Sequence, residues 1–194
     1  MKHASIVLIT LAAVSLAGCE TTSSRPYQVS TPNVLAIQAA IGGDQSKVKI
    51  GSFSAADGVK TDLTCRAMGA LEVAPGQSAI VYIREALQSE LFQAGVYDQA
   101  GGQTIEATLD QLNFNSFGTG SWKVALRLRS STLPEGYSVA VNYSFKTSYS
   151  ALKACQNVID AFQPTVSTLI QKAVNDPNFK KLAGEKAIAE VPAS

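Results

Sequence analysis

The sequence is nearly devoid of histidine, and this absence excludes much chemistry. Its single histidine is His3, which lies in a leading segment that we expect to be removed. Without histidine, Ser-His-Asp and Cys-His catalysis are excluded in their usual forms, and the commonest zinc and copper ligand is missing. We therefore predict a protein that is not an enzyme, with no catalytic residues, no metal and no cofactor.

An excess of charge of one sign is also missing. Lys and Arg together number 16 and Asp and Glu 15, and Lys2 would leave with the leading segment, so the charges balance. Nucleic-acid-binding proteins carry a basic footprint, so we predict no nucleic-acid partner. Long apolar runs are absent too. Residues 4–16 (ASIVLITLAAVSL) are uncharged, but a bilayer-spanning helix needs about 20 residues.

This apolar run has the setting of an export signal. It follows a positive start at residues 1–3 and ends in small residues, which is the pattern of a secretory signal peptide. The next residues, Leu16-Ala17-Gly18-Cys19, resemble the bacterial lipobox, in which the cysteine receives a diacylglycerol and the chain is cut before it. Ordinary cleavage after an A-x-A-like site is the alternative. Two or more acyl chains would anchor the protein stably, since each buried CH₂ contributes about 0.8 kcal/mol.

The residue after the candidate lipidation site predicts the location. Lipoproteins with this kind of signal tend to stay in the inner membrane when Asp follows the cysteine. Glu20 stands there instead, so we predict the outer membrane, on its periplasmic face. The expected partners are the membrane, through the amino-terminal lipid, and an outer-membrane or other envelope protein.

The composition along the chain predicts four segments. Residues 1–18 are the expected signal peptide, and 19–32, rich in Ser, Thr and Pro, the expected lipid anchor and flexible tether. Residues 33–183 have the patterns of a single α+β periplasmic domain. Residues 184–194 are expected to form a loose tail.

Two cysteines remain in the expected domain, Cys65 and Cys155. In an oxidising compartment they are most simply one disulfide, which would close a loop worth about 4 kcal/mol in the chain-entropy model. Two buried free thiols or a redox site are the alternatives. The sequence has no C-x-x-C motif, which is the usual sign of the latter.

Hydrophobic periodicity predicts the secondary structure. A 3.6-residue period from Ser78 to Gly95 predicts a helix, and a second helix begins near Tyr149 and should kink or restart at Pro164. The other predicted elements are a short helix over 33–41, a first strand over 48–53, an irregular stretch over 54–76 with a short strand at 71–73, strands over 105–114, 122–128 and 137–145, a β-bulge near Asp110-Gln111, and a helix cap at Asp176-Pro177.

The order of these predicted elements indicates an α+β fold. One apolar face per strand indicates a two-layer sandwich, with a largely antiparallel sheet of about four strands and two main helices packed on one face. Cys155 falls on the apolar face of the second helix, so Cys65 should reach it from beneath that helix.

Basic residues gather on the expected open face of the sheet. They are Lys123, Arg127, Arg129 and Lys146. One hypothesis is a strip that binds LPS phosphates or another anionic envelope polymer. The alternative is cross-strand pairing with Glu106 and Asp110, or simple solvation, since such pairs contribute only tenths of a kcal/mol.

Three carboxylates in the irregular stretch leave a third class of function open. Asp57, Asp62 and Glu72 are residues of the type that hydrolyse glycosides when two of them stand at a defined separation. Sequence distance does not give spatial distance, and solvated surface carboxylates are the favoured interpretation.

Together the lipobox, the helix IREALQSELFQAGVY over 83–97, three alternating strands and a long terminal helix resemble small Gram-negative outer-membrane lipoproteins of the YajG kind. More loosely, the outline is similar to the LPS-assembly lipoprotein LptE. The closest points are Arg84, Leu87, Glu90, Gly95 and Tyr97. The first resemblance implies a lipoprotein without an assigned activity, and the second a plug and chaperone for a β-barrel. We therefore predict a lipid-anchored accessory or assembly subunit of the envelope, with a binding module for LPS or peptidoglycan as the alternative.

Overall fold

The computed structural model describes residues 25–43 and 47–184. The expected signal peptide, the lipobox with Cys19, and residues 185–194 lie outside the described residues. The elements in chain order are the helix α1 (Thr31–Ile37), the π-turn η1 (Gln38–Gly42), the strand β1 (Val48–Ala55), the helix α2 (Ala79–Gln93), the strands β2 (Gln103–Asn115), β3 (Thr119–Ser130) and β4 (Leu133–Lys146), and the helices α3 (Ala151–Val174) and α4 (Phe179–Leu182).

The fold is α+β, as predicted, but its sheet is mixed. The four strands are ordered β1-β2-β3-β4. β2 pairs antiparallel with β3, and β3 with β4, in two hairpin connections. β1 pairs parallel with β2, because α2 carries the chain back between them, which a parallel pair requires. α2 and α3 are the two long helices, and α1 and α4 are short additions to the predicted pair.

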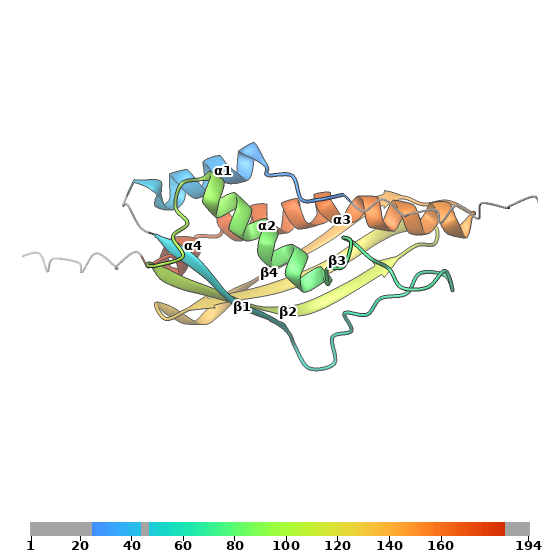
Figure 1. Cartoon of the computed structure of the whole chain (residues 1–194), viewed down its shortest axis with the longest axis horizontal. Coiled ribbons are helices and arrows are strands. Elements are labelled where there is room, and N and C mark those ends of the chain that lie inside the picture. Colours follow the sequence, from blue (N-terminus) through green and yellow to red (C-terminus); the bar gives the residue numbers. More distant parts are fainter. Residues whose placement is uncertain (1–24, 44–46, 185–194) are drawn as a thin grey trace, which may run out of the picture.

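The helices meet the sheet through alternate residues of its strands. Along β3 every second side chain is buried, including Trp122, Val124 and Leu128. α3 contacts β3 and β4, and α2 contacts β1; both helices cross in front of the strands in Figure 1. The buried residues of α2, α3 and the alternate positions of the strands form one core, and the polar residues of the strands point away from it.

Strand register and the first long helix follow local signals that the sequence contains. The predicted β-bulge is confirmed, since the β2–β3 register shifts between Leu109 and Gln111. Ser78 caps α2 by accepting a hydrogen bond from the Val81 N–H. Gly95 follows the helix with a positive φ of 76°, the conformation that ends helices most easily in glycine.

α3 is one continuous helix through Pro164, not two helices as a restart would require. Proline removes one backbone donor and crowds the preceding turn. Two threonine hydroxyls near it bond back to carbonyls one turn earlier, Thr165 to Ala161 at 2.6 Å and Thr168 to Pro164 at 2.8 Å, a pattern that favours a bent helix. Burial of the apolar stripe on both sides of Pro164, at Phe162 and Val166, outweighs the tendency of proline to end a helix.

Two local predictions differ from the structure. The short strand at 71–73 is absent from the described loop, where β-type pairing is limited to the isolated bridges Thr64–Ala70 and Ala74–Gln77. The last helix begins at Phe179, with Asn178 as its cap. Asp176 instead closes a turn by accepting from the Asn178 N–H at 2.8 Å. Both differences arise where turn residues are dense and no hydrophobic period sets the boundary.

Candidate functional site

The basic residues of the sheet lie on its open face, and two of them are paired. Arg127 Nη2 lies 3.3 Å from Asp110 Oδ2, and Arg129 Nη2 lies 3.1 Å from Glu106 Oε2. The arginines join β3 to β2 as the pairing alternative predicted. Both pairs are largely exposed, so each contributes little to stability.

Lys123 and Lys146 have a different setting. Both are exposed, and neither takes part in an ion pair within the described part of the chain. Lys123 stands opposite Asn113 on β2 and Asn142 on β4. Small side chains surround this position, at Ser121, Ala125, Ser138, Ala140 and Ser144. Around Lys123 the open face therefore carries small side chains, and among the described residues Lys123 and Lys146 have no ion-pair partner.

The candidate carboxylates lie at the surface of one loop. Asp57, Asp62 and Glu72 are each exposed in the loop between β1 and α2. Within residues 25–43 and 47–184, no three His, Cys, Asp or Glu side chains are grouped as a metal would require. The helices of the described chain are also too short or too polar to cross a membrane.

A buried carboxylate fixes the amino-terminal strap, which we define as residues 25–30. Glu90 on α2 is fully buried. Its Oε1 atom accepts from the Tyr27 hydroxyl at 2.5 Å, from the Ser30 N–H at 3.0 Å and from Asn33 Nδ2 at 3.2 Å. Asn33 also donates to the Ser167 carbonyl on α3 at 3.1 Å. One oxygen atom therefore joins the strap, α1 and α2.

Further contacts extend this attachment along the strap. The Tyr82 hydroxyl donates to the Arg25 carbonyl at 3.2 Å, and Arg25 Nε lies 3.8 Å from Asp160 on α3. The segment 19–32, expected to be a flexible tether, is in its described part held against α2 and α3. A chain anchored at Cys19 would thus reach the domain through a short connection.

The strap's tyrosine remains a hydrogen-bond donor over a wide pH range. Burial, followed by the hydrogen bond and the charge of Glu90, raises the pKa of Tyr27 far above its ordinary value. Periodicity alone did not single out Glu90, but a signal was present. With Ile83, Leu87 and Ala94 it falls on the apolar stripe of α2, where a lone carboxylate must find buried partners.

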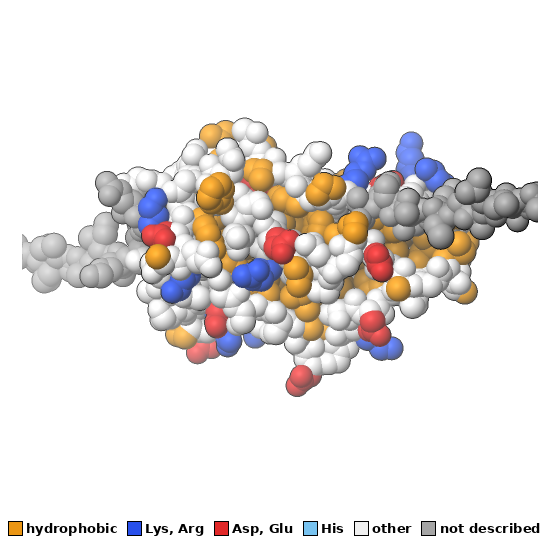
Figure 2. Space-filling model, in the orientation of Figure 1, with side chains coloured by type: hydrophobic (Ala, Val, Ile, Leu, Met, Phe, Trp, Pro, Cys, Tyr) orange, Lys and Arg blue, Asp and Glu red, His pale blue; other side chains and the backbone are white. Residues whose placement is uncertain are grey.

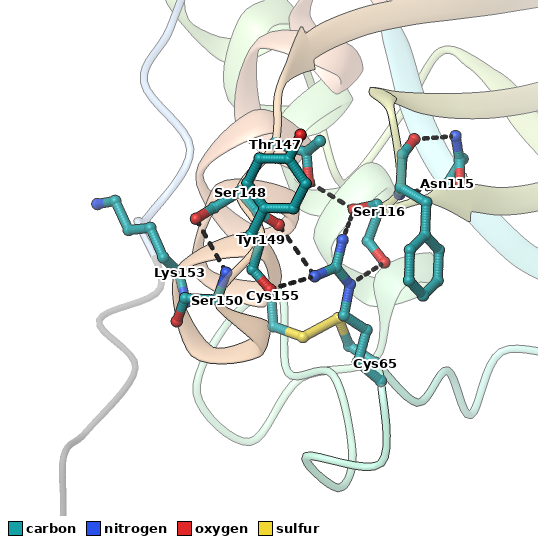
Figure 3. Close-up of a disulfide and its surroundings, with 11 residues drawn as sticks. Cys65, Asn115, Ser116, Thr147, Ser148, Tyr149, Ser150, Lys153 and Cys155 are labelled. Atoms are coloured by element: carbon teal, nitrogen blue, oxygen red, sulfur yellow. Dashed lines mark hydrogen bonds between the residues drawn. A yellow bond between two sulfur atoms is a disulfide. The ribbon is translucent and has the colours of Figure 1, made fainter.

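The predicted pair of cysteines forms a disulfide at the first turns of α3. Cys65 and Cys155 are bonded, with 5.8 Å between their Cα atoms, and both are buried (Figure 3). The bond attaches the β1–α2 loop to α3. We call the surrounding region, residues 65–68, 116–118 and 147–153, the disulfide end.

Arg66 holds the three segments of the disulfide end together. Its Nε donates to Ser116 Oγ at 3.1 Å, Nη1 to the Ser148 carbonyl at 3.0 Å, and Nη2 to the Ser116 carbonyl. Its guanidinium carbon lies 4.1 Å from the centre of the Phe117 ring. All the acceptors are neutral, so this half-buried positive charge has no carboxylate beside it.

The backbone at Arg66 is strained. Arg66 and Ala67 have φ values of 44° and 57°, and are the non-glycine residues with positive φ in the described chain. Such conformations cost of order 1 kcal/mol each and persist where surrounding contacts fix them. The disulfide and the Arg66 hydrogen bonds supply those contacts.

Large apolar side chains are exposed around Arg66. Phe117 is 66% exposed and Tyr149 is fully exposed. Together with Arg66, Gly118, Thr147 and Ser148 they line a depression of about 320 Å³. Met68 and Leu152 on the adjoining segments are also exposed. Sequence reasoning missed this region, although an aromatic residue within each of two polar turns, NSFGTG and KTSYS, was its signal.

The helix side of the molecule carries charges of both signs over its described residues (Figure 2). These side chains are scattered over the described part of this face, with apolar side chains between them. The candidate surfaces are therefore the open face of the sheet and the disulfide end, while Glu90 and the strap set how the domain is attached.

Comparison with known proteins gives limited information. No family model matches the chain, and no curated protein matches it. Among solved structures, a DUF330 protein of Xanthomonas campestris is similar, at 10% sequence identity and a TM-score of 0.46, over 66% of this chain and 84% of that one. Another solved chain, described only as an uncharacterized protein, has 10% identity and a TM-score of 0.37 over 66% and 92%. Likenesses of this degree carry no functional conclusion.

Proposed function

We propose that this chain is a non-enzymatic, lipid-anchored lipoprotein on the periplasmic face of the outer membrane, and that it acts as an accessory or assembly subunit for an envelope partner. The observation that carries the proposal is the Leu16-Ala17-Gly18-Cys19 motif behind an apolar run. The strap supports it, because an attached segment just downstream would hold the domain close to the anchored membrane.

The proposal includes a two-layer arrangement in which the helices bury one face of the sheet and the other face meets the partner. The small-residue surface around Ala125 and Ala140 supports this role. Small side chains permit close approach of another chain, and the two outward ion pairs, Arg127–Asp110 and Arg129–Glu106, can give a docked partner its orientation.

Anchoring is tested with labelled palmitate in intact cells. The wild-type chain should carry the label and sediment with outer membranes, while Cys19→Ser should lose both. Cys155→Ser provides the matched control, since it removes a cysteine without touching the motif. A wild-type chain that stays unlabelled and freely soluble would refute the proposal.

The partner is tested by cross-linking in place. A photo-cross-linking residue at Ala125 or Ala140 should capture one envelope protein in stoichiometric amount, and the same residue at Leu35 on α1 should not. Capture from Leu35 alone would place the partner on the helices and contradict the sheet-face role.

A binding module for LPS or peptidoglycan is the second candidate, favoured by Lys123 and Lys146, which have no ion-pair partner among the described residues. Replacement of Lys123 and Lys146 by Ser should then abolish LPS or peptidoglycan binding without lowering the melting temperature. The double change of Arg127 and Arg129 to Ser should weaken it less, because those charges already have partners. Unchanged binding in the lysine variant would remove this candidate.

A further inference from the structure

We propose that the disulfide end is a bilayer-contact surface, in which Phe117 and Tyr149 enter the lipid headgroup layer of the membrane that anchors the chain. This inference rests on the proposed function, since it takes the membrane at Cys19 as given. It adds an orientation: the domain would stand with one end on the bilayer and the open face of its sheet accessible.

The side chains at this end have the chemistry of a membrane interface. Aromatic residues concentrate where lipid meets water, because their rings are apolar and polarisable. Phe117 and Tyr149 are displayed here with Met68 and Leu152, which makes four of the large apolar side chains that the described chain exposes. These four lie on the three segments of the disulfide end, and Phe117 and Tyr149 line the same depression. The other exposed apolar residues are Val29 on the strap, Leu35 on α1, and Val81 and Phe92 on α2.

The backbone that carries the two rings is held in place. The Asn115 side chain accepts from the Phe117 N–H at 3.1 Å and donates to the Phe117 carbonyl at 2.7 Å, which fixes the turn. Arg66 lies under the Phe117 ring and donates to the Tyr149 carbonyl at 3.4 Å. Ordering this backbone before contact lowers the entropy cost that a flexible loop would incur on binding.

The charges at this end fit an anionic headgroup. The residues that line the depression include Arg66 and no acidic side chain. Lys146 and Lys153 are exposed on either side of the 147–150 turn, and α3 directs its amino-terminal end, capped by Ser150, toward the same region (Figure 3). Basic residues are attracted to the negative surface potential of an anionic bilayer.

The strap brings the membrane within reach. Arg25 lies beside Asp160 on α3, and the helix from Ala151 to Asp160 rises about 14 Å at 1.5 Å per residue. The chain from Cys19 to Arg25 spans at most about 20 Å when extended. An anchored Cys19 therefore permits the disulfide end to touch the same bilayer.

Tryptophan fluorescence tests the contact in the lipidated full chain. The protein is reconstituted into vesicles of phosphatidylethanolamine and phosphatidylglycerol that contain brominated acyl chains. The single native tryptophan, Trp122, is buried and gives a constant background. Phe117→Trp should show blue-shifted emission that is strongly quenched. Tyr149→Trp, at a fully exposed position, should show the same blue shift and quenching. It provides a second test in case Phe117→Trp disturbs the folding of its turn.

The matched control is Phe92→Trp. Phe92 is 70% exposed, a fraction similar to that of Phe117. It lies at the carboxyl end of α2, beside the start of β1 and at the opposite end of the molecule from the first turns of α3 (Figure 1). Its emission should remain unquenched. Equal quenching at Phe92 and Phe117, or no quenching at Phe117 and Tyr149 beyond the Trp122 background, would overturn the proposal.

Two further measurements distinguish failure of the proposed function from failure of the bilayer-contact surface. Vesicle flotation reports the anchor alone, so a protein that does not float refutes the proposed function, and one that floats unquenched refutes only the contact surface. Omission of phosphatidylglycerol should reduce the quenching, and quenching that requires added envelope proteins would assign the surface to a protein partner and overturn the bilayer assignment.

Discussion

At the scale of single residues, Glu90 is the least expected feature of the molecule. Its Oε1 accepts three hydrogen bonds, while its Oε2 and Asn33 Oδ1 are buried without a partner among the described residues. Such acceptors are costly to leave unsatisfied. An amide group in place of Oε2 would remove one of these two unpartnered acceptors.

Glu90→Gln is therefore expected to preserve the free energy of unfolding within about 1 kcal/mol. The glutamine oxygen keeps the bonds from Tyr27, Ser30 and Asn33, and its amide replaces the unpartnered Oε2 acceptor. Glu90→Leu should cost on the order of 3 kcal/mol, because the Tyr27 hydroxyl, the Ser30 N–H and the Asn33 amide lose their acceptor. Denaturant titration of both variants measures the difference. Equal destabilisation by both changes would show that the negative charge, not the acceptor geometry, holds the strap.

Tyr27 makes stability sensitive to alkaline pH. Its pKa is raised above the ordinary 10.0 in the native state. At a pH between the ordinary pKa and the raised native pKa, the unfolded chain releases a proton that the folded chain keeps. Stability is then complete below pH 10 and falls as pH rises further. Burial raises the pKa of Tyr82 to about 12, which acts in the same direction. Tyr27→Phe should give a shallower decline of unfolding free energy above pH 10, and an unchanged slope would contradict the account.

At the scale of elements, α3 shows how packing overrides a local preference. Its one unfavourable residue, Pro164, sits between buried turns of a helix that runs from Ala151 to Val174. Pro164→Ala restores one backbone donor and should raise the free energy of unfolding by about 1–3 kcal/mol. Thermal melts followed by circular dichroism test this, with Gln163→Ala as a neighbouring control. A loss of stability would mean that the proline is needed for the fit of α3 to the sheet.

Elements with a clear hydrophobic period could be predicted from sequence, and those without one could not. Local sequence patterns predict the bulge at Asp110 and the Ser78 cap, and both are present. They do not predict the direction of β1, because the pattern of that strand is the same in parallel and antiparallel pairs. The strap and the Arg66 hydrogen bonds depend on contacts between residues far apart in the chain, which no single-sequence pattern reveals.

At the scale of the whole molecule, the disulfide joins the β1–α2 loop to the carboxy-terminal half over a separation of 90 residues. This loop has little regular structure, so the disulfide fixes its position where few packing contacts do. Replacement of Cys65 and Cys155 by Ala should lower the free energy of unfolding by about 4 kcal/mol in the chain-entropy model. The measurement is denaturant unfolding under matched oxidising conditions.

The same double variant also tests the strain at Arg66. Without the bond, Arg66 and Ala67 are expected to relax, so hydrogen exchange at residues 65–70 should rise more than exchange in β2 and β3. Uniform exchange across both regions would mean that Arg66 alone maintains the disulfide end.

The reach of Asn33 has a consequence for the order in which the chain acquires structure. Its amide bonds to the Ser167 carbonyl, 134 residues further along, so α1 cannot complete its contacts until α3 has been synthesised and has formed. The amino-terminal part of the chain is made first and completes its contacts last. If Cys19 is lipidated as we propose, the modifying enzyme would act while α1 is still without its contacts to α3.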